Sequence, residues 1–347
     1  MGLFKDCHGG IDLAFDIIIP HYDEPWKTCE KFFQIMDLQR DADFSKVKII
    51  FVQDGEENAF SSEHFENRPY TVEQITIPHG GVSAARNAGL KASTAEWVMF
   101  CDCDDMFANV YALRDILNVL PAPNFDMLWM EYYSEDKMAN GEMRLGKRGL
   151  NVRDLVHIHG KLYRRQFLLD NDLWFDPSLK FNEDSCFNAI ATNLVDNQRT
   201  GTINTIDTAY IWCFREGSAT TSQENIGIAI LGLYQRNKAV CDVFRRQLDY
   251  KRYCGMVART IWDTYHSLNV DEFTPELQEI YDDFKKWYPP RKKCWLFVDK
   301  DTMNQVKKIS QDEHIWREEE AESRWGIHKN SHFRENISID EWLKQFD

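Results

Sequence analysis

The stretch Trp97-Val-Met-Phe-Cys101-Asp102-Cys103-Asp104-Asp105 decides the fold, because an apolar run ends in it abruptly on three carboxylates. Five apolar residues in succession predict a fully buried strand, and the ligands of open α/β sheets collect beyond the carboxyl ends of the strands. Hard oxygen ligands favour Mg²⁺ or Mn²⁺, and Mg²⁺ is commonly shared with substrate phosphates. The stretch therefore predicts a divalent cation beside a nucleotide diphosphate, unless Asp104 and Asp105 merely cap a following helix.

Strands and amphipathic helices alternate along the rest of the amino-terminal half. Buried strands are predicted at residues 15–19 and 47–52, a third near 72–77, and another at 126–131. Apolar residues recur at helical spacing in residues 29–36, 82–89 and 110–120. This order predicts an α/β fold with a Rossmann-like, mostly parallel sheet flanked by helices.

Four motifs in order strengthen this interpretation. They are Asp16-Ile-Ile-Ile-Pro20-His21-Tyr22, then Val52-Gln-Asp54-Gly55, then Gly81-Val-Ser-Ala-Ala-Arg86-Asn87-Ala-Gly89, and Cys101-Asp102-Cys103-Asp104-Asp105. Together they resemble the family 2 glycosyltransferases of the GT-A fold. The resemblance continues through Phe181-Asn-Glu183-Asp184 and Phe214-Arg215-Glu-Gly-Ser218, and it covers roughly residues 14–221. It implies a GT-A catalytic domain over residues 1–221.

The resemblance also implies which residues bind the nucleotide-sugar donor. The end of the first strand and Asp54 are placed like the family's pocket for base and ribose. Arg86 is placed like the arginine that reaches the nucleotide, and its rigid fork of donors suits phosphate oxygens. Arg215 and Ser218 resemble an Arg-x-x-Ser segment near the diphosphate. The expected donor-binding set is thus Pro20, His21, Tyr22, Asp54, Arg86, Asp102, Cys103, Arg215 and Ser218.

Catalysis is expected to rest on two pairs of acids. Asp102 and Asp104 would hold Mn²⁺ or Mg²⁺, which neutralises charge on the departing diphosphate. By the resemblance, Asp184 deprotonates the acceptor hydroxyl, and Glu183 supports it. These roles describe direct displacement with inversion. On pattern alone, Glu183 and Asp184 are also ordinary acidic residues of a first helical turn.

Residues 222–347 change to long helical segments, predicted at 226–248, 253–268 and 275–287. This mainly helical C-terminal region is a candidate for acceptor binding or oligomerisation. Within it, Pro289-Pro290-Arg-Lys-Lys293 is the clearest basic cluster, interpreted as a solvated turn. His157-x-His159 is interpreted as structural, because no third soft ligand lies nearby in the sequence.

The amino-acid composition narrows the expected cellular location and the expected classes of binding partner. The 347 residues carry a net charge of −15, which argues against general affinity for nucleic acids or anionic membranes. Nine cysteines occur without Cys-x-x-Cys pairs, as expected of reduced thiols in the cytoplasm. No apolar run is long enough to be a membrane span, so no stable membrane insertion is expected.

The leading hypothesis is transfer of a sugar from a nucleotide-diphosphate donor, expected to be a UDP-sugar, to a saccharide or glycoconjugate acceptor. A second is glycosylation of modified nucleic-acid bases, which would require a basic groove leading to Asp184. A third is a catalytically silent module that binds nucleotide-sugars, against which the intact Asp102, Asp104, Arg86 and Asp184 argue.

Overall fold

The structure is a computed structural model, and it describes residues 14–120, 124–138, 140–148, 157–179, 181–203, 209–216, 226–268, 272–312 and 337–347. Contacts divide the chain into two compact units. One holds both β-sheets with α1 to α4, and the other holds α5 and the helices from α6 to the carboxyl end.

The first unit is built on a seven-stranded sheet with the strand order β10-β6-β9-β4-β1-β2-β3. Its strands are β1 (Phe15–His21), β2 (Val47–Asp54), β3 (Thr71–Ile77), β4 (Trp97–Phe100), β6 (Met127–Met130), β9 (Lys161–Arg164) and β10 (Thr200–Ile203). β1 pairs in parallel with β2 and β4, and β2 with β3, so these carboxyl ends share one edge. The predicted α/β fold with a mostly parallel sheet is confirmed.

Two features of this unit were not predicted from the sequence. β9 lies antiparallel between β4 and β6, and it interrupts the parallel order. A second, four-stranded sheet has the order β5-β11-β7-β8, from β5 (Met106–Phe107), β7 (Tyr132–Lys137), β8 (Met143–Arg148) and β11 (Tyr210–Trp212). Most exposed positions of β8 are polar or charged, so the strand lacks the alternation that reveals a half-buried strand.

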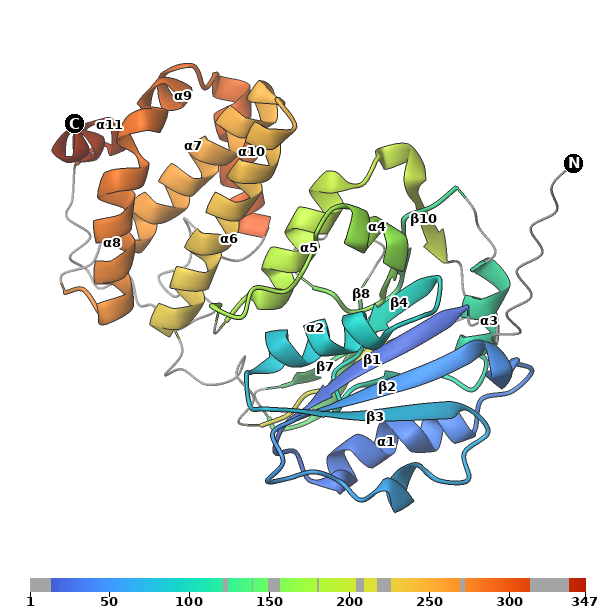
Figure 1. The fold of residues 1–347 in the computed structure, drawn as a ribbon. Helices are drawn as coiled ribbons and strands as arrows, with labels where there is room; N and C mark the ends of the chain where they lie inside the picture. Colours follow the sequence, from blue (N-terminus) through green and yellow to red (C-terminus); the bar gives the residue numbers. More distant parts are fainter. Residues whose placement is uncertain are drawn as a thin grey trace, which may run out of the picture. The chain divides into compact units, whose positions relative to one another are not determined.

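Helices cover both faces of the main sheet. α1 (Trp26–Asp37) and α2 (Val82–Ala92) lie on opposite faces of β1 to β3 (Figure 1), and α3 (Ala112–Val119) and α4 (Arg165–Asp170) complete the unit. Each helix turns its apolar stripe inward; Cys29, Phe32, Phe33 and Met36 of α1 are buried at the predicted spacing. α2 packs closely because Gly89 has no side chain. A Cβ there would lie 2.3 Å from Cγ2 of Ile18.

The second unit is helical, as predicted for the C-terminal region. Its helices are α5 (Glu183–Leu194), α6 (Ile226–Arg246), α7 (Tyr250–Ser267), α8 (Pro275–Trp287), α9 (Lys292–Leu296), α10 (Lys300–Asp312) and α11 (Ile339–Leu343). α8 begins where Thr274 accepts a hydrogen bond from the Leu277 amide, with Pro275 in the first turn. Ile261, Ile280 and Phe284 are fully buried in a core of the unit's own.

Candidate active site

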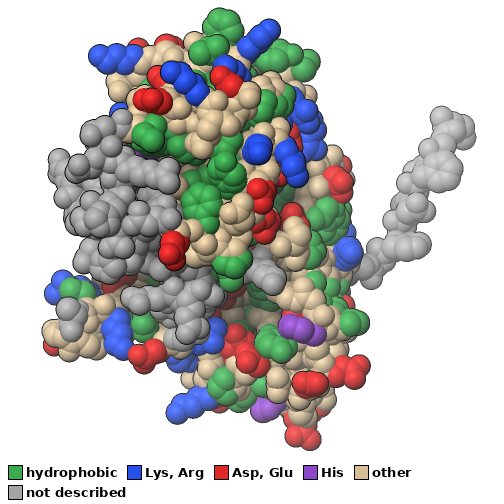
Figure 2. All heavy atoms as spheres, turned by 90° about the vertical axis from the view of Figure 1, so that its left-hand side faces the viewer, with side chains coloured by type: hydrophobic (Ala, Val, Ile, Leu, Met, Phe, Trp, Pro, Cys, Tyr) green, Lys and Arg blue, Asp and Glu red, His purple; other side chains and the backbone are tan. Residues whose placement is uncertain are grey.

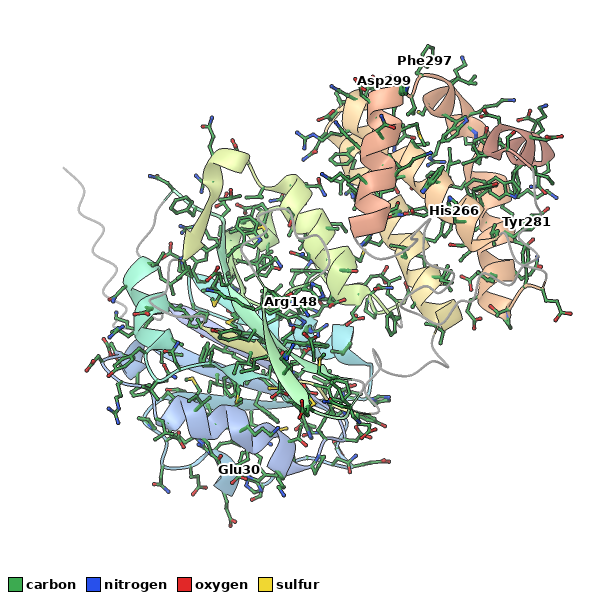
Figure 3. The ribbon with its side chains drawn as sticks, turned by 180° about the vertical axis from the view of Figure 1, so that it is seen from behind. Glu30, Arg148, His266, Tyr281, Phe297 and Asp299 are labelled. Carbon is green, nitrogen blue, oxygen red and sulfur yellow. The ribbon has the colours of Figure 1, made fainter. Side chains whose placement is uncertain are left out.

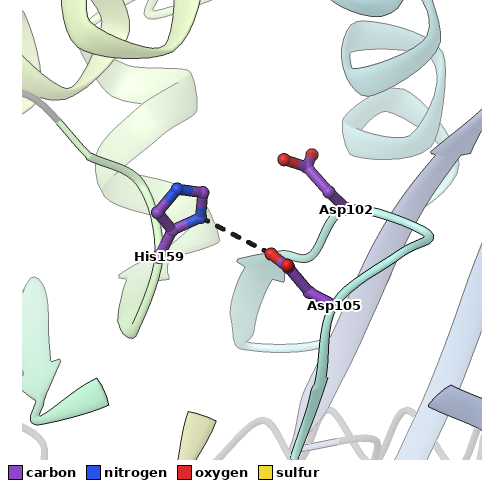
Figure 4. A group of neighbouring side chains, drawn as sticks. All are labelled: Asp102, Asp105 and His159. Carbon is purple, nitrogen blue, oxygen red and sulfur yellow. Dashed lines mark ion pairs between the residues drawn. The ribbon is translucent and has the colours of Figure 1, made fainter. Parts of the chain in front are cut away.

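The acids that follow β4 lie at the carboxyl edge of the sheet, together with one histidine. Asp102, Asp105 and His159 each offer one ligand atom, and these atoms lie within 4.8 Å of one another (Figure 4). Nδ1 of His159 is 3.7 Å from Oδ2 of Asp105. His159 precedes β9, so the antiparallel insertion of that strand carries it to the acids. The sequence interpretation treated His159 as structural, because the ligands that now surround it lie far away along the chain.

Charge in this cluster fits a site for a cation. Asp105 is fully buried, and burial together with the charges of Asp102 and Asp104 raises the pKa of its carboxyl well above the usual range. A cation would relieve that repulsion. Two carboxylates and an imidazole form a donor set for a divalent cation. Asp105 also accepts hydrogen bonds from the Tyr210 hydroxyl and the Cys213 amide, which hold it in place.

Arg86 reaches this cluster from α2. Its Nη2 donates a 2.7 Å hydrogen bond to Oδ1 of Asp102, and its guanidinium lies over the Phe175 ring. The Arg86 side chain is only 4% exposed, whereas that of Asp102 is 29% exposed. Arg86 is therefore part of a mostly buried ion pair at the site and is not a surface one. The pair places a fixed positive charge beside the carboxylate.

Asp54, at the end of β2, holds the turn that leads into α2. Its two carboxylate oxygens accept hydrogen bonds from the Gly80 and Gly81 amides at 2.7 and 2.8 Å, and His79 Nδ1 lies 3.0 Å away. The His79 ring in turn stacks on Tyr22, with centroids 4.4 Å apart. Tyr22 is 44% exposed, so this stacked pair presents an aromatic face beside Asp54. His79 was not singled out from the sequence, since only the turn brings it to Tyr22.

Three other predicted donor-binding residues face the interior. His21 is buried at the end of β1, where Nδ1 lies 2.7 Å from Oε1 of Gln53 and Nε2 lies 2.7 Å from the Glu24 carbonyl. Pro20 lies in the same buried strand. The Cys103 side chain belongs to the hydrophobic core, and contact with Cys29 and burial raise the pKa of its thiol. These three buried side chains therefore support the carboxyl edge of the sheet and are not exposed at its surface.

Glu183 and Asp184 form the first turn of α5, as predicted. Oδ1 of Asp184 accepts a 2.6 Å hydrogen bond from the Ser185 amide. The preceding turn is held by α6: Asn182, at a φ of 61°, donates from its side chain to the Ala229 carbonyl. Gly232 of α6 leaves room for the Phe181 carbonyl, 2.3 Å from where a Cβ would stand. The helical unit thus fixes the backbone immediately before the two acids.

The remaining predicted residues do not belong to the group of Asp102, Asp105 and His159. Asp104 is half-buried after β4 and is not part of the three-residue group. Arg215 is half-buried and is grouped with the helical unit, as are Glu183 and Asp184. Ser218 lies outside the described residues. Within one unit, therefore, the structure brings together Asp102, Arg86 and the neighbouring acids.

Comparisons with known proteins indicate the family that the chain resembles. A sequence model described as "Glycosyl transferase family 2" matches residues 16–178. The chain is 27% identical over 195 residues to the "Uncharacterized glycosyltransferase EpsJ" of Bacillus subtilis (strain 168), an alignment that covers 50% of this chain and 55% of that protein. It is also 27% identical over 191 residues to the poly(ribitol-phosphate) beta-N-acetylglucosaminyltransferase TarS of Staphylococcus aureus (strain Mu50 / ATCC 700699), covering 50% and 32%. These alignments thus span about half or less of each relative's length.

Among solved structures, the fold is similar to that of S. aureus TarS 1-349 in complex with UDP-GlcNAc. The TM-score is 0.50 at 18% sequence identity, and the match covers 87% of this chain and 92% of that chain. Among the described residues, no helix combines the length and the apolar character needed to cross a bilayer.

Proposed function

Because the chain carries a family 2 glycosyltransferase domain over residues 16–178, we propose that it transfers a sugar from a UDP-sugar to a hydroxyl group of a saccharide or glycoconjugate acceptor. The resemblance inferred from four sequence motifs is confirmed by that match, and the fold belongs to the GT-A class. One observation carries the proposal. Within such a domain, Asp102 lies at the end of a central strand, beside Asp105 and His159 and paired with Arg86.

Asp102 is the proposed centre of donor binding. With Asp104, or with Asp105 and His159, it would hold Mn²⁺ or Mg²⁺. The bound ion would supply positive charge to the departing diphosphate. Arg86 adds a fixed cation next to Asp102, and Tyr22 with His79 offers an aromatic face for the base. Asp54, Arg215 and Ser218 complete the proposed donor set, with Asp54 also holding the turn at Gly80 and Gly81.

Asp184 is the proposed general base. In the reaction, the acceptor oxygen forms a bond to the anomeric carbon while the bond from that carbon to the diphosphate breaks. The acceptor proton goes to the Asp184 carboxylate, and attack from the opposite face inverts the anomeric centre. Glu183 is proposed to support Asp184 from the same helical turn. The backbone that carries both acids is fixed by Asn182 and Gly232.

The proposal is tested by hydrolysis and transfer from UDP-sugars with Mn²⁺. We expect Asp184→Asn to lower kcat by about 10²- to 10⁴-fold while UDP binding stays unchanged, because only proton removal is lost. Asp102→Asn should instead weaken binding of UDP in the presence of Mn²⁺. Asp282→Asn, on an exposed position of α8, serves as the matched control and should change neither quantity.

Two results would contradict these assignments. Turnover that survives Asp184→Asn would remove this residue from the role of base. Failure of UDP, and of other nucleoside diphosphates, to bind with Mn²⁺ would leave a module without the proposed activity.

A further inference from the structure

One surface of the helical unit carries four highly exposed apolar side chains. Phe297, Leu248, Leu296 and Tyr250 are 81%, 69%, 68% and 67% exposed, more than any other large apolar side chain that the structure describes. They come from two segments. Leu248 lies in the connection between α6 and α7 and Tyr250 begins α7, whereas Leu296 ends α9 and Phe297 follows it. In Figure 3 the labelled Phe297 stands at the outer edge of the unit. Exposed apolar side chains that gather on one surface commonly mark interaction sites.

The two segments lie next to each other in the fold. Cys254 of α7 contacts Cys294 of α9, and a Cβ on Gly255 would lie 3.7 Å from Thr302 of α10. α9 and α10 both pack against α7, so the two segments are neighbours in the fold. The Asp299 carboxylate accepts a 2.7 Å hydrogen bond from the Thr302 amide at the start of α10. We call this surface, residues 245–252 with 291–301, the basic-apolar patch.

Charge in the basic-apolar patch opposes that of the whole chain. Its two segments contain eight Lys or Arg residues and three Asp residues, whereas the chain as a whole has a net charge of −15. Ion pairs engage Arg245 with Asp242, Arg252 with Asp249, and Lys292 with Asp347. Lys293 and Lys300 are exposed and enter no ion pair with the residues that the structure describes. Figure 2 shows apolar and basic side chains side by side, with some acidic ones, along its upper end.

Local backbone geometry holds the apolar side chains outward. The Phe297 and Val298 amides donate to the Cys294 and Trp295 carbonyls, so the turn after α9 is fixed. Leu248 adopts a φ of 58°, a left-handed conformation that glycine adopts with less strain. The Leu248 side chain is 69% exposed, so it buries little apolar area in return for this strain. Non-glycine residues held in such conformations are enriched at active sites, ligand clamps and switch regions.

We propose that the basic-apolar patch docks the protein on an anionic membrane surface. Leu296 and Phe297 would enter the boundary between headgroups and acyl chains, and the surrounding Lys and Arg would neutralise lipid phosphates. A soluble polyanion would satisfy the charges but would leave the four apolar side chains in water. This contact is peripheral and is consistent with the lack of a spanning helix among the described residues. The basic cluster near Lys293, interpreted from the sequence as a solvated turn, belongs to this surface.

Cosedimentation of the full chain with lipid vesicles tests the proposal. We expect binding to vesicles of phosphatidylcholine mixed with phosphatidylglycerol, little binding to phosphatidylcholine alone, and weaker binding as salt rises. Lys293→Glu with Lys300→Glu should weaken binding more than tenfold, since each lysine near an anionic surface contributes about fivefold. Leu296→Ser with Phe297→Ser should also weaken binding more than about tenfold. The matched controls Lys27→Glu and Leu38→Ser, exposed positions in the sheet unit, should leave binding unchanged.

Leu248→Gly separates binding from folding. It should raise the thermal midpoint, because the left-handed position no longer carries a side chain, and should weaken vesicle binding. Three results would overturn the proposal. One is no vesicle binding by the wild type. Another is binding that survives Leu296→Ser with Phe297→Ser but is displaced by heparin, which would indicate a site for soluble polyanions. The third is a dimer that dissociates with those two serine substitutions.

Discussion

At the scale of single residues, the site is defined by what each polar group already contacts. Asp102 pairs with Arg86, and Asp105 is held by Tyr210 and Cys213. Asp54 shows the consequence most directly, since its two oxygens accept hydrogen bonds from the turn that begins α2. A residue expected to contact a nucleotide thus has a second, structural function that exists without any ligand.

We therefore expect Asp54→Ala to lower the free energy of unfolding by about 1–3 kcal/mol in the absence of nucleotide, because partly buried amide donors lose their acceptor. Urea unfolding measures this change. Asp23→Ala, at an exposed position soon after β1, is the control and should stay within about 0.5 kcal/mol of wild type. An unchanged free energy of unfolding in Asp54→Ala would mean that the turn is held by other contacts.

At the scale of secondary-structure elements, close packing places α2, and with it Arg86, against the sheet. Gly89 allows this approach to Ile18 of β1, whereas Gly255, in the middle of α7, has its nearest neighbour at an ordinary 3.7 Å. We expect Gly89→Ala to destabilise the protein by about 1–3 kcal/mol through overpacking. Gly255→Ala should instead stabilise it by about 0.5–1 kcal/mol, because alanine favours the helix. Chemical denaturation compares the two; equal effects would contradict the difference in packing.

The contact between α6 and α8 gives a prediction about pH. Desolvation raises the pKa of Asp283, but hydrogen bonds from Lys238 and Tyr234 outweigh it, so that the pKa is lowered from 3.8. A lowered pKa in the folded state contributes stability above the unfolded-state value, and that stability is lost as the pH falls through the folded-state value. Asp283→Asn should therefore lower the thermal midpoint near pH 7 and reduce the loss of stability in acid. Asp282→Asn, next to it and exposed, should behave as wild type; identical acid profiles for all three proteins would refute the assignment.

At the scale of the whole molecule, each unit has its own hydrophobic core. The sheet unit buries residues such as Ile17, Phe51 and Trp97, and the helical unit buries Ile261, Ile280 and Phe284. A unit with its own core can unfold cooperatively by itself. The proposed nucleotide site lies mainly on the sheet unit, so a ligand should stabilise the two cores unequally.

Calorimetry should accordingly show two thermal transitions. UDP with Mn²⁺ should stabilise the sheet unit by about 2.7 kcal/mol at a ligand concentration 100 times Kd. The temperature of that unit's transition should therefore rise. Gly89→Ala identifies that transition by lowering it, and Ile280→Ala should lower the other. A single transition, or a shift confined to the helical unit, would contradict this division.

The sequence by itself determined the alternation of strands and helices, the parallel core of the sheet and the acids at the end of β4. These follow from local periodicity and from a family resemblance carried by contiguous motifs. Three expectations stay predictions: the cytoplasmic location, the domain boundary at residue 221 and the role of Asp184. Only the tertiary structure placed His159 beside Asp102 and Asp105, stacked His79 on Tyr22, and gathered the basic-apolar patch from two separate segments. The physical reason is that such contacts join residues with no local pattern, because they depend on how strands pair and on where turns bring the chain back.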